Sequence, residues 1–293
     1  MDSDRLWVNG GIVARDAPVL SALDRGFLYG DGFFETTRIL QGRPLFLGLH
    51  LARLAASCTD TGFGWSPDAG VVRSAVHDLI AANRVQDGYL RITVSRGAHA
   101  GVLTDLTAAQ PTLVVEARPA DIAPLAVPSP LCLARSEWRR NERSPLVRHK
   151  ALSYMDNVLA LAAARRRGAD EVYFLNSQAR LTEGATSNLF WVRRGAVHTP
   201  AVGCGLLPGI TRGIVLDICR EETLPVREGA FPDADLIEAE EVFCTNGLRG
   251  VMGVRSLLDP PHAFPADAPV TAAIRRAYVE RALGGERPCL QPP

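Results

Sequence analysis

The sequence predicts a mixed fold of the α+β or α/β class, in which a short linker joins two domains. Stretches rich in β-branched and aromatic residues alternate with stretches whose apolar residues recur at helical spacing. At 293 residues the chain is also longer than a typical single domain. The proline-rich run RPADIAPLAVPSP separates its two halves. We therefore expect a first domain over residues 1–118, a linker over 119–130 and a second domain over 131–293.

The first domain is expected to combine an antiparallel sheet with two helices. Asn9-Gly10-Gly11 and Gln41-Gly42 are turn sequences, and each lies between two runs with strand character. Farther along, a helical pattern ends at Gly62, and a second one places Val72 and Val76 on one apolar face. The expected elements are hairpins over 5–15 and 32–47, helices over 47–62 and 71–85, and strands over 88–97 and 111–120.

The second domain is expected to mix helices and strands in the same way. Ser153, with Asp156 three residues later, forms a capping-box pattern for a helix whose last arginines precede Gly168. The expected elements are a strand over 131–141, a helix over 153–167, a strand over 171–176, a hairpin over 180–200, a helix over 209–222, a strand over 240–254 and a helix over 268–283.

Composition argues against several classes of partner. With 32 basic and 32 acidic residues the chain has no net charge that would attract nucleic acid or an anionic membrane. The start, MDSDRLWVNGG, lacks the pattern of a signal peptide, and no apolar run is long enough to cross a bilayer. We therefore expect a cytoplasmic protein that binds neither nucleic acid nor membranes.

The cysteines predict neither a disulfide framework nor a zinc site. None of them forms a CxxC pair, and none has histidines at the spacing of a zinc finger. They are expected to be buried or incidental thiols in a reducing compartment. The cysteines are Cys58, Cys132, Cys204, Cys219, Cys244 and Cys289.

Lys150 is the single lysine among the 32 basic residues. GC-rich codons can explain the many arginines, but they do not explain why one lysine remains. Its neighbours Leu146, Val147 and Leu152 are apolar, and burial favours the neutral form of an amine. A neutral amine can attack an aldehyde and form a Schiff base, which is the chemistry of pyridoxal phosphate enzymes. Lys150 is therefore the expected catalytic residue.

A pyridoxal phosphate cofactor needs a carboxylate beside its ring nitrogen and several donors around its phosphate. Glu183 lies between two strand-like runs and can supply the carboxylate. Gly209-Ile210-Thr211 stands at an expected helix start, where N–H groups and the helix dipole attract an anion. Thr245 offers a hydroxyl at a strand end, and Arg53 offers a guanidinium on a helix. These residues together favour a pyridoxal 5′-phosphate site.

Eight segments of the chain also resemble, in their order, the segments of one known family. They are RGFLYGDGFFETTR, HLARL, HKALSYMDNVLA, GADEVYFLN, LTEGATSNLFWV, TP, LLPGITR and CTNGLRGV, and they extend over roughly residues 5–255. This order is similar to that of the class IV aminotransferases, the fold-type-IV pyridoxal phosphate enzymes. The family includes branched-chain aminotransferases, D-amino acid aminotransferases, R-selective amine transaminases and 4-amino-4-deoxychorismate lyases. Eight ordered matches are more specific than any single motif.

The resemblance implies a role for each matching residue. Lys150 looks like the Schiff-base lysine, Glu183 like the glutamate that pairs with the pyridine nitrogen, and Asn188 like the asparagine on the phenolic oxygen side. Tyr154 matches a tyrosine that lies close to the cofactor. The family is dimeric and builds each active site from both subunits, so the resemblance also implies a homodimer. The residues expected to bind the phosphate are Arg53, Gly209, Ile210, Thr211 and Thr245.

Members of the family differ in the step that follows removal of the substrate's Cα proton. An aminotransferase passes the amino group of an amino acid or amine to a 2-keto acid, whereas the lyase eliminates pyruvate from aminodeoxychorismate. FFETTRI and TNGLRGVMGV look most like the lyase branch, yet Met252-Gly253-Val254 stands where that branch often has MPV. The branched-chain motif FEGIR is half matched by FETTR, and the D-amino acid pattern has His99 without its partner arginine.

We expect an amino-acid aminotransferase, with 4-amino-4-deoxychorismate lyase as the close alternative. A protein that binds the cofactor without turnover is a third hypothesis, against which the intact lysine and glutamate argue. Arg38, Arg91 and Arg96 are expected to hold a substrate carboxylate, although strand arginines are more often structural. The expected partners are therefore a small-molecule amino donor and a keto acid acceptor.

Overall fold

The computed structural model describes residues 4–99, 103–104, 110–265 and 268–284, and the chain divides into two compact units. The first unit consists of Met1–Ile122 and His149–Ser153, and the second of Ala123–Arg148 and Tyr154–Pro293. The first division falls inside the predicted linker. Residues 149–153, predicted to belong to the second domain, are grouped with the first unit instead, because they pair with a strand of its sheet.

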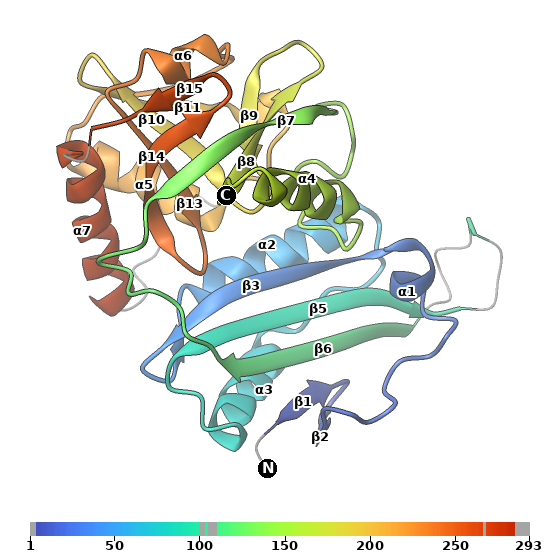
Figure 1. The fold of residues 1–293 in the computed structure, drawn as a ribbon. Helices are drawn as coiled ribbons and strands as arrows, with labels where there is room; N and C mark the ends of the chain where they lie inside the picture. Colours follow the sequence, from blue (N-terminus) through green and yellow to red (C-terminus); the bar gives the residue numbers. More distant parts are fainter. Residues whose placement is uncertain (1–3, 100–102, 105–109, 266–267, 285–293) are drawn as a thin grey trace. The chain divides into compact units, whose positions relative to one another are not determined.

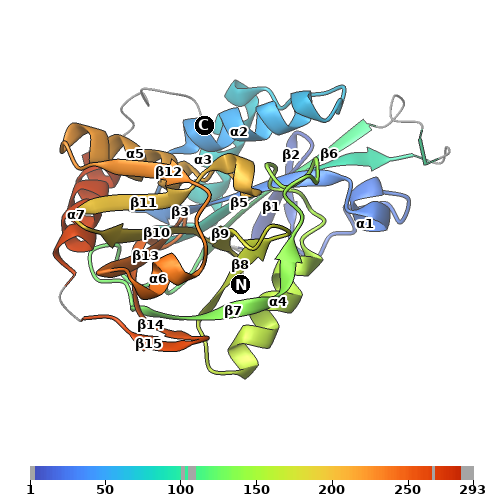
Figure 2. The same cartoon turned by 90° about the horizontal axis from the view of Figure 1, so that it is seen from above.

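The first unit is built on a six-stranded antiparallel sheet. In chain order its elements are β1 (Arg5–Val8), β2 (Gly11–Ala14), α1 (Arg25–Tyr29), β3 (Gly32–Leu40), β4 (Arg43–Pro44), α2 (Leu47–Asp60), α3 (Ala69–Ala82), β5 (Gly88–Ala98) and β6 (Gln110–Pro119). The strand order is β2-β1-β6-β5-β3-β4. α2 packs on β3 and α3 packs on β1 and β6, so both helices lie on one side of the sheet (Figures 1 and 2).

The local patterns of the first unit explain these elements, and the predicted hairpins, helices and strands are confirmed. Asn9 and Gly10 have φ angles of 44° and 105°, as a tight hairpin turn requires. Val72 and Val76 of α3 are fully buried in the core between helices and sheet. Side chains alternate along a strand, so neighbouring residues of β3 face opposite sides of the sheet. α1 is a short helix absent from the prediction.

The second unit contains a larger sheet of nine strands. Its elements are β7 (Leu131–Arg140), α4 (Met155–Arg166), β8 (Glu171–Asn176), β9 (Leu181–Gly184), β10 (Asn188–Arg193), β11 (Ala196–Pro200), the 3₁₀ turn η1 (Val202–Cys204), α5 (Ile210–Glu221), β12 (Val226–Gly229), α6 (Ala234–Ile237), β13 (Glu241–Asn246), β14 (Gly250–Leu258), β15 (Pro261–Ala263) and α7 (Pro269–Gly284). The strand order is β12-β11-β10-β13-β14-β7-β8-β9, with β15 on β14.

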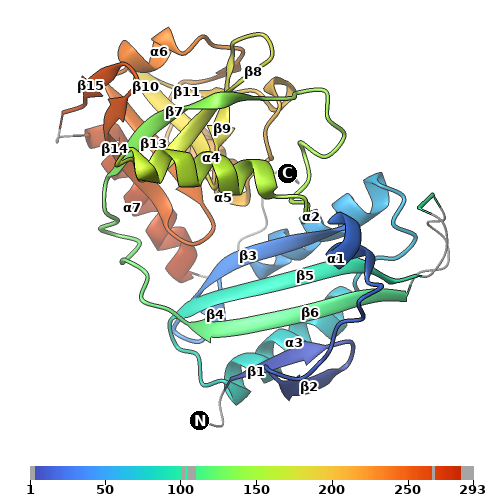
Figure 3. The ribbon, with the colours of Figure 1, turned by 45° about the vertical axis from the view of Figure 1, so that its right-hand side comes forward.

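A further pairing between β9 and β10 closes part of this sheet on itself. Six strands, β10-β13-β14-β7-β8-β9, thereby form a ring with mixed parallel and antiparallel neighbours. α4 packs along β7 and β8, as Figure 3 shows, while α5 and α7 pack against each other and on β13. The ring brings strands that are distant in sequence next to one another, which decides the positions of the site residues described below.

Three predictions for the second unit are wrong in detail. The predicted hairpin over 180–200 consists of three strands, β9, β10 and β11. α4 begins at Met155 with Tyr154 as its N-cap and no side-chain cap, so Ser153 and Asp156 do not form a capping box. The predicted strand over 240–254 is a hairpin of β13 and β14. It turns because the Asn246 side chain accepts hydrogen bonds from the backbone N–H groups of Leu248 and Arg249. The short elements β12, α6 and β15 are absent from the prediction.

Five of the six cysteines lie among the described residues, and each is a buried, unpaired thiol. Burial raises the pKa of the Cys58 and Cys219 thiols to about 11 and that of Cys244 to about 12. Cys289 lies outside the described residues. In the part of the chain that the structure describes, no helix combines the length and hydropathy needed to cross a membrane.

The first prediction concerns the core under α3. Leu79→Ala removes a side chain with no solvent exposure and should lower the free energy of unfolding by about 2–5 kcal/mol, because a cavity remains. Val71→Ala, on the same helix at an exposed position, should change it by less than about 0.5 kcal/mol. Urea unfolding of both variants checks this, and equal midpoints for the two would contradict the assigned helix face.

Candidate active site

Lys150 is held by backbone pairing with the edge of β3. The N–H of Phe34 donates to the carbonyl of Lys150 at 2.9 Å, and the N–H of Leu152 donates to the carbonyl of Gly32 at 2.9 Å. Phe33 and Ala151 form the β-bridge between these two hydrogen bonds. Residues 150–152 therefore lie as a short added strand beside the start of β3, and the Lys150 backbone is fixed there.

The Lys150 amine lies over an aromatic ring that it shares with one of the predicted substrate arginines. Its Nζ is 4.4 Å from the centre of the Phe34 ring. The Arg91 guanidinium carbon is 4.1 Å from the centre of the same ring, and the Arg91 Nε donates to the Thr93 hydroxyl at 3.2 Å. Aromatic faces attract cations, so the Phe34 ring, itself 6% exposed, is a platform for both groups.

Arg53, predicted to bind the cofactor phosphate, is engaged by a buried carboxylate on the opposite face of β3. Its Nε and Nη2 donate to the two oxygens of Glu35 at 2.8 and 2.6 Å, a bidentate pair. The Nδ1 of His50 lies 2.6 Å from Glu35 Oε2. His50 and Arg53 are three residues apart on α2 and share one helix face. The three side chains are buried.

The charges of this cluster are set by burial and by one another. Burial alone would raise the pKa of Glu35, but the Arg53 charge and the His50 hydrogen bond lower it to about 2. Burial lowers the pKa of His50, and the charges of Arg53 and Lys150 lower it further against the opposing effect of Glu35. His50 is therefore neutral at pH 7 and donates its Nδ1–H to an ionised Glu35.

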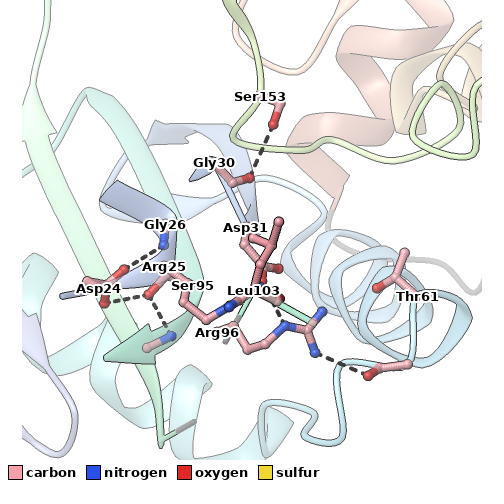
Figure 4. Close-up of polar contacts among 12 residues, drawn as sticks. Asp24, Arg25, Gly26, Gly30, Asp31, Thr61, Ser95, Arg96, Leu103 and Ser153 are labelled. Atoms are coloured by element: carbon pink, nitrogen blue, oxygen red, sulfur yellow. Dashed lines mark hydrogen bonds and ion pairs between the residues drawn. The ribbon is translucent and has the colours of Figure 1, made fainter. Parts of the chain in front are cut away.

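Arg96, the second predicted substrate arginine, is buried elsewhere in the first unit. Arg96 donates to Asp31 Oδ2 at 2.9 Å and to the Gly62 carbonyl at 3.1 Å, and its guanidinium lies over Phe63. Asp31 also pairs with Arg25, close to the hydrogen bond from Ser153 to Gly30 (Figure 4). The described contacts therefore bring Arg91, and not Arg96, to the ring that carries Lys150.

Arg38 lies on the same face of the sheet as Phe34, because the two are four residues apart on β3. It is 5% exposed, and its Nη2 donates to the Ile122 carbonyl at 3.2 Å.

In the second unit, three predicted cofactor residues lie in one row across neighbouring strands. Asn188 of β10 is opposite Glu183 of β9 on one side and opposite Thr245 of β13 on the other. Residues at directly paired positions point to the same face of a sheet, about 5 Å from strand to strand. The pairing of β9 with β10 therefore lines up a carboxylate, an amide and a hydroxyl.

Glu183 is held in this row by several donors. Its Oε2 accepts from the backbone N–H of Leu207 at 3.0 Å and from the Asn188 amide at 3.4 Å. Its Oε1 lies 3.3 Å from Nη2 of Arg140, and the two side chains are 11% and 13% exposed. Arg140 also donates to the Asn157 side chain and stacks on Phe174. A generic hairpin glutamate would be exposed, whereas this one is buried and oriented.

Tyr154 lies in the second unit, where its hydroxyl donates to the Ala185 carbonyl at 2.6 Å. The Asn157 amide donates to the same carbonyl at 2.6 Å. Burial and the charge of Glu183 raise the pKa of the Tyr154 phenol to about 12, so it remains a proton donor at neutral pH. Tyr154 and Asn157, three residues apart at the start of α4, thus hold the loop between Glu183 and Asn188.

The start of α5 has the properties of an anion site. Gly209 is its N-cap without a side-chain hydrogen bond, and the first turn contains no acidic residue. The first N–H groups of a helix have no partner within it, and they face an anion favourably. A Cβ on Gly209 would lie 1.9 Å from Oδ1 of Asn188, so any larger residue there would displace the Asn188 side chain. Ile210 and Thr211 follow directly and are buried.

The donor set fits pyridoxal phosphate. Within the described part of the chain, the Thr245 hydroxyl is buried without a hydrogen-bond partner, as a group reserved for a ligand would be. The start of α5 and this hydroxyl suit a phosphate, and the buried Glu183 suits a protonated ring nitrogen. The amine of Lys150 and the guanidinium of Arg53 belong to the first unit, so the predicted residues come from both units.

Sequence reasoning missed four polar residues of this region. Glu35 and His50 could have been found from an acid inside an apolar strand and from a histidine three residues before Arg53. Asn157 shares a helix face with Tyr154. For Arg140 the sequence contains no signal, because its contact with the β9 glutamate arises only in the folded sheet.

Comparisons with known proteins identify the family. The family model described as "Amino-transferase class IV" matches residues 32–257. The chain is 31% identical to a Methanocaldococcus jannaschii protein named as a branched-chain-amino-acid aminotransferase, over 82% of this chain and 83% of that one. It is 27% identical to an aminodeoxychorismate lyase of Bacillus subtilis, with 83% of each chain covered. It is 29% identical to a D-alanine aminotransferase of Bacillus licheniformis, over 93% and 95% of the chains.

Solved structures agree. A branched-chain amino acid aminotransferase from Thermobaculum terrenum in its pyridoxal phosphate form matches with a TM-score of 0.87 and 25% identity, over 98% of this chain and 96% of that one. A 4-amino-4-deoxychorismate lyase from Pseudomonas aeruginosa matches with a TM-score of 0.81 and 28% identity, over 94% and 98%. The chain therefore belongs to the class IV aminotransferases, has their fold-type-IV architecture and takes pyridoxal 5′-phosphate as its cofactor.

The second prediction tests the buried charge beside Arg53. The pKa of Glu35 is about 2 in the folded protein and about 4.3 in an unfolded chain, so its charge stabilises the fold above pH 4.3. This stabilisation is lost as the pH falls from 4.3 towards 2. Glu35→Gln should cost about 3–5 kcal/mol of unfolding free energy at pH 7, because the buried Arg53 guanidinium loses the opposite charge of Glu35. The cost should shrink as the pH falls through that window.

Urea unfolding of both proteins between pH 2 and pH 7 measures this difference. Glu116→Gln is the matched control, because Glu116 pairs with Arg15, whose side chain is 37% exposed. It should cost less than about 1 kcal/mol at any pH. A Glu35→Gln effect that stays constant over the whole range would contradict the assigned cause.

Proposed function

We propose that this protein is an amino-acid aminotransferase, which moves an amino group between an amino acid and a 2-keto acid. The observation that carries the proposal is the shared position of Lys150 and Arg91 on the Phe34 ring. An amino acid bears its carboxylate one carbon from the amine that reacts. A guanidinium on the ring that carries the catalytic amine supports a substrate with both groups, because guanidinium matches a carboxylate in charge and geometry.

Each proposed role follows from the chemistry of the side chain. Pyridoxal phosphate, when bound, supplies a carbonyl carbon for amines and a ring that withdraws electrons from the substrate's Cα. Lys150 would hold the cofactor, then accept the Cα proton at its Nζ and return it. Glu183, already oriented by Leu207 and Asn188, would keep the ring nitrogen protonated.

The phosphate would be bound by the start of α5 at Gly209, Ile210 and Thr211, by Thr245 and by Arg53. The N–H donors and hydroxyls of the second unit support this role, as does the absence of an acidic residue in the first turn of α5. Arg53 carries the positive charge that a phosphate needs, and its pairing with Glu35 would fix the direction of the guanidinium.

The second candidate is 4-amino-4-deoxychorismate lyase, which is favoured by the similarity to proteins of that name. Both reactions begin with removal of a proton by the lysine. They differ in whether that lysine returns the proton or a substituent of the substrate leaves as pyruvate. We place the aminotransferase first, because two of the three relatives described above bear aminotransferase names.

We further propose that the protein acts as a homodimer in the cytoplasm, with a small-molecule amino donor and a keto acid acceptor as its partners. The family resemblance is the support for the dimer. Several large apolar side chains of α1 and α4 are exposed in the single chain, among them Phe27 and Met155 at 74% and 64%. Apolar surface of this kind is often covered by a protein partner.

The third prediction tests the reaction. The purified, pyridoxal phosphate-loaded protein is incubated with L- and D-amino acids plus 2-oxoglutarate or pyruvate, and in parallel with aminodeoxychorismate. We expect a new amino acid from the acceptor with at least one donor, and no 4-aminobenzoate. Lys150→Ala should abolish product formation in every reaction. Formation of 4-aminobenzoate alone would establish the lyase, and full turnover by Lys150→Ala would refute the role of the lysine.

The fourth prediction tests the carboxylate-binding role of Arg91. Arg91→Ala should raise KM for the amino acid donor about tenfold or more, because a charged hydrogen bond to the substrate is lost. Arg118→Ala, which removes an exposed arginine from the neighbouring strand, should leave KM unchanged. Steady-state kinetics of the two variants with one donor checks this. An equal KM for Arg91→Ala and the parent protein would exclude Arg91 from substrate binding.

A further inference from the structure

Glu171 is a fully buried carboxylate that has no part in the proposed reaction. It is the first residue of β8 and has no solvent exposure. Its Oε1 accepts from the backbone N–H groups of Val172 at 2.9 Å and Ala185 at 3.2 Å. Its Oε2 accepts from the N–H and hydroxyl of Thr186 at 3.1 and 2.5 Å, and from the Ser187 hydroxyl at 3.2 Å.

All five groups are uncharged donors, and four of them come from one loop. Burying a carboxylate is costly unless hydrogen bonds replace the lost water, and the five donors to Glu171 fill the acceptor capacity of its oxygens. The loop, residues 185–187, connects β9 to β10. Glu171 therefore anchors the N–H and hydroxyl donors of the loop to β8, a strand that lies beside β9 in the sheet.

The carbonyl side of the same loop is held independently. The Ala185 carbonyl accepts from Tyr154 and from Asn157, both at 2.6 Å. The N–H of Gly184 donates to the Ser187 carbonyl at 2.7 Å and closes the hairpin. The loop is thus clamped from two sides by groups of β8 and α4.

The loop decides how two proposed cofactor residues face each other. Glu183 is the second-last residue of β9, and Asn188 is the first residue of β10, directly after the loop. The two residues are paired across the strands. Side chains of a strand change face with each single-residue slip, so the loop conformation determines whether Glu183 and Asn188 share a face. We propose that Glu171 is a positioning residue for Glu183 and Asn188, an inference that rests on the proposed function of these two residues.

The obvious competing interpretation is that Glu171 stabilises the fold and nothing more. A matched residue separates the two. Glu241 is also a buried carboxylate at the first position of a strand, and it accepts from the N–H groups of Val270 and Thr271 and from the Thr271 hydroxyl at 2.6–2.9 Å. It caps α7 and contacts neither the loop nor Glu183 among the described residues.

The experiment compares Glu171→Gln with Glu241→Gln, each made in the parent protein and in Glu183→Gln. Glutamine has the same size as glutamate, but its NH2 group donates and cannot accept. At position 171 this group would face N–H or O–H donors of the loop, so some of the hydrogen bonds that hold the loop would be lost. The dissociation constant of pyridoxal 5′-phosphate is measured by equilibrium dialysis with cofactor-free protein. Thermal stability of the cofactor-free protein and kcat at saturating cofactor are measured alongside.

We expect Glu171→Gln to raise the dissociation constant about tenfold and to lower kcat by a similar factor, as loss of supporting contacts does at other cofactor sites. In the Glu183→Gln protein the same substitution should lower kcat further by less than about twofold. If Glu171 acts through Glu183, the effects of the two substitutions on kcat do not multiply. Glu241→Gln should lower thermal stability and leave the dissociation constant within about twofold of the parent value.

Four outcomes would overturn the inference. A Glu171→Gln protein with an unchanged dissociation constant, or with a kcat effect that multiplies in full with that of Glu183→Gln, would make Glu171 merely structural. An equal rise in the dissociation constant for Glu241→Gln would show a general effect of lost stability. If Glu183→Gln itself changed neither quantity, the proposed function of Glu183 would fail together with the inference.

A milder variant covers the case in which Glu171→Gln does not fold. Thr186→Val removes one donor to Glu171 from an exposed position of the loop. It should raise the dissociation constant about threefold in the parent protein, because the loop loses one of its hydrogen bonds to Glu171 and keeps the others. In Glu183→Gln its effect on kcat should again fall below about twofold. If Thr186→Val left the dissociation constant of the parent protein unchanged, the inference would be overturned.

Discussion

The backbone pairing of residues 150–152 with the start of β3 is the constraint on which the position of Lys150 in the first unit depends. A strand edge offers N–H and C=O groups that need partners, and this short segment supplies them through Lys150 and Leu152. The pairing fixes the lysine backbone, and alternation along β3 then puts Phe34 on one face and Glu35 on the other. The lysine owes its position to this contact, whereas the aromatic platform and the buried acid are placed by β3 itself, which pairs with β5.

The predicted cofactor residues of the second unit depend on strand pairing of a different kind. β9 and β13 are far apart in sequence, yet both pair with β10, and this puts Glu183, Asn188 and Thr245 in one row. A hairpin loop with two independent anchors keeps the register of that row. The same architecture lets α5 begin beside Asn188, so closely that a Cβ on Gly209 would displace the Asn188 side chain. The acid and the amide flank one hairpin loop, whereas the hydroxyl and the helix start come from more distant parts of the sequence and are brought beside Asn188 by the fold.

Buried carboxylates in this chain are neutralised in two ways, and the difference reflects their tasks. Glu35 pairs with the Arg53 guanidinium and with a neutral histidine, so its charge is balanced by another charge. Glu171 and Glu241 are surrounded by backbone N–H groups and hydroxyls, so their charge is balanced by dipoles. A charge pair sets the direction of a functional cation, whereas a ring of dipoles sets the shape of a loop or the start of a helix.

The sequence by itself determined the family, the cofactor and most helices and strands. Ordered motifs and the periods of helices and strands are local properties of the sequence, and Lys150, Glu183 and the start of α5 lie within those motifs. Only the tertiary structure decided that Ser153 donates a hydrogen bond to Gly30 instead of capping α4, and that Arg96 pairs with Asp31. It also decided that Arg140 and Glu171 support the Glu183 hairpin. The physical reason is that such contacts arise from the register of distant strands, which no local spacing encodes.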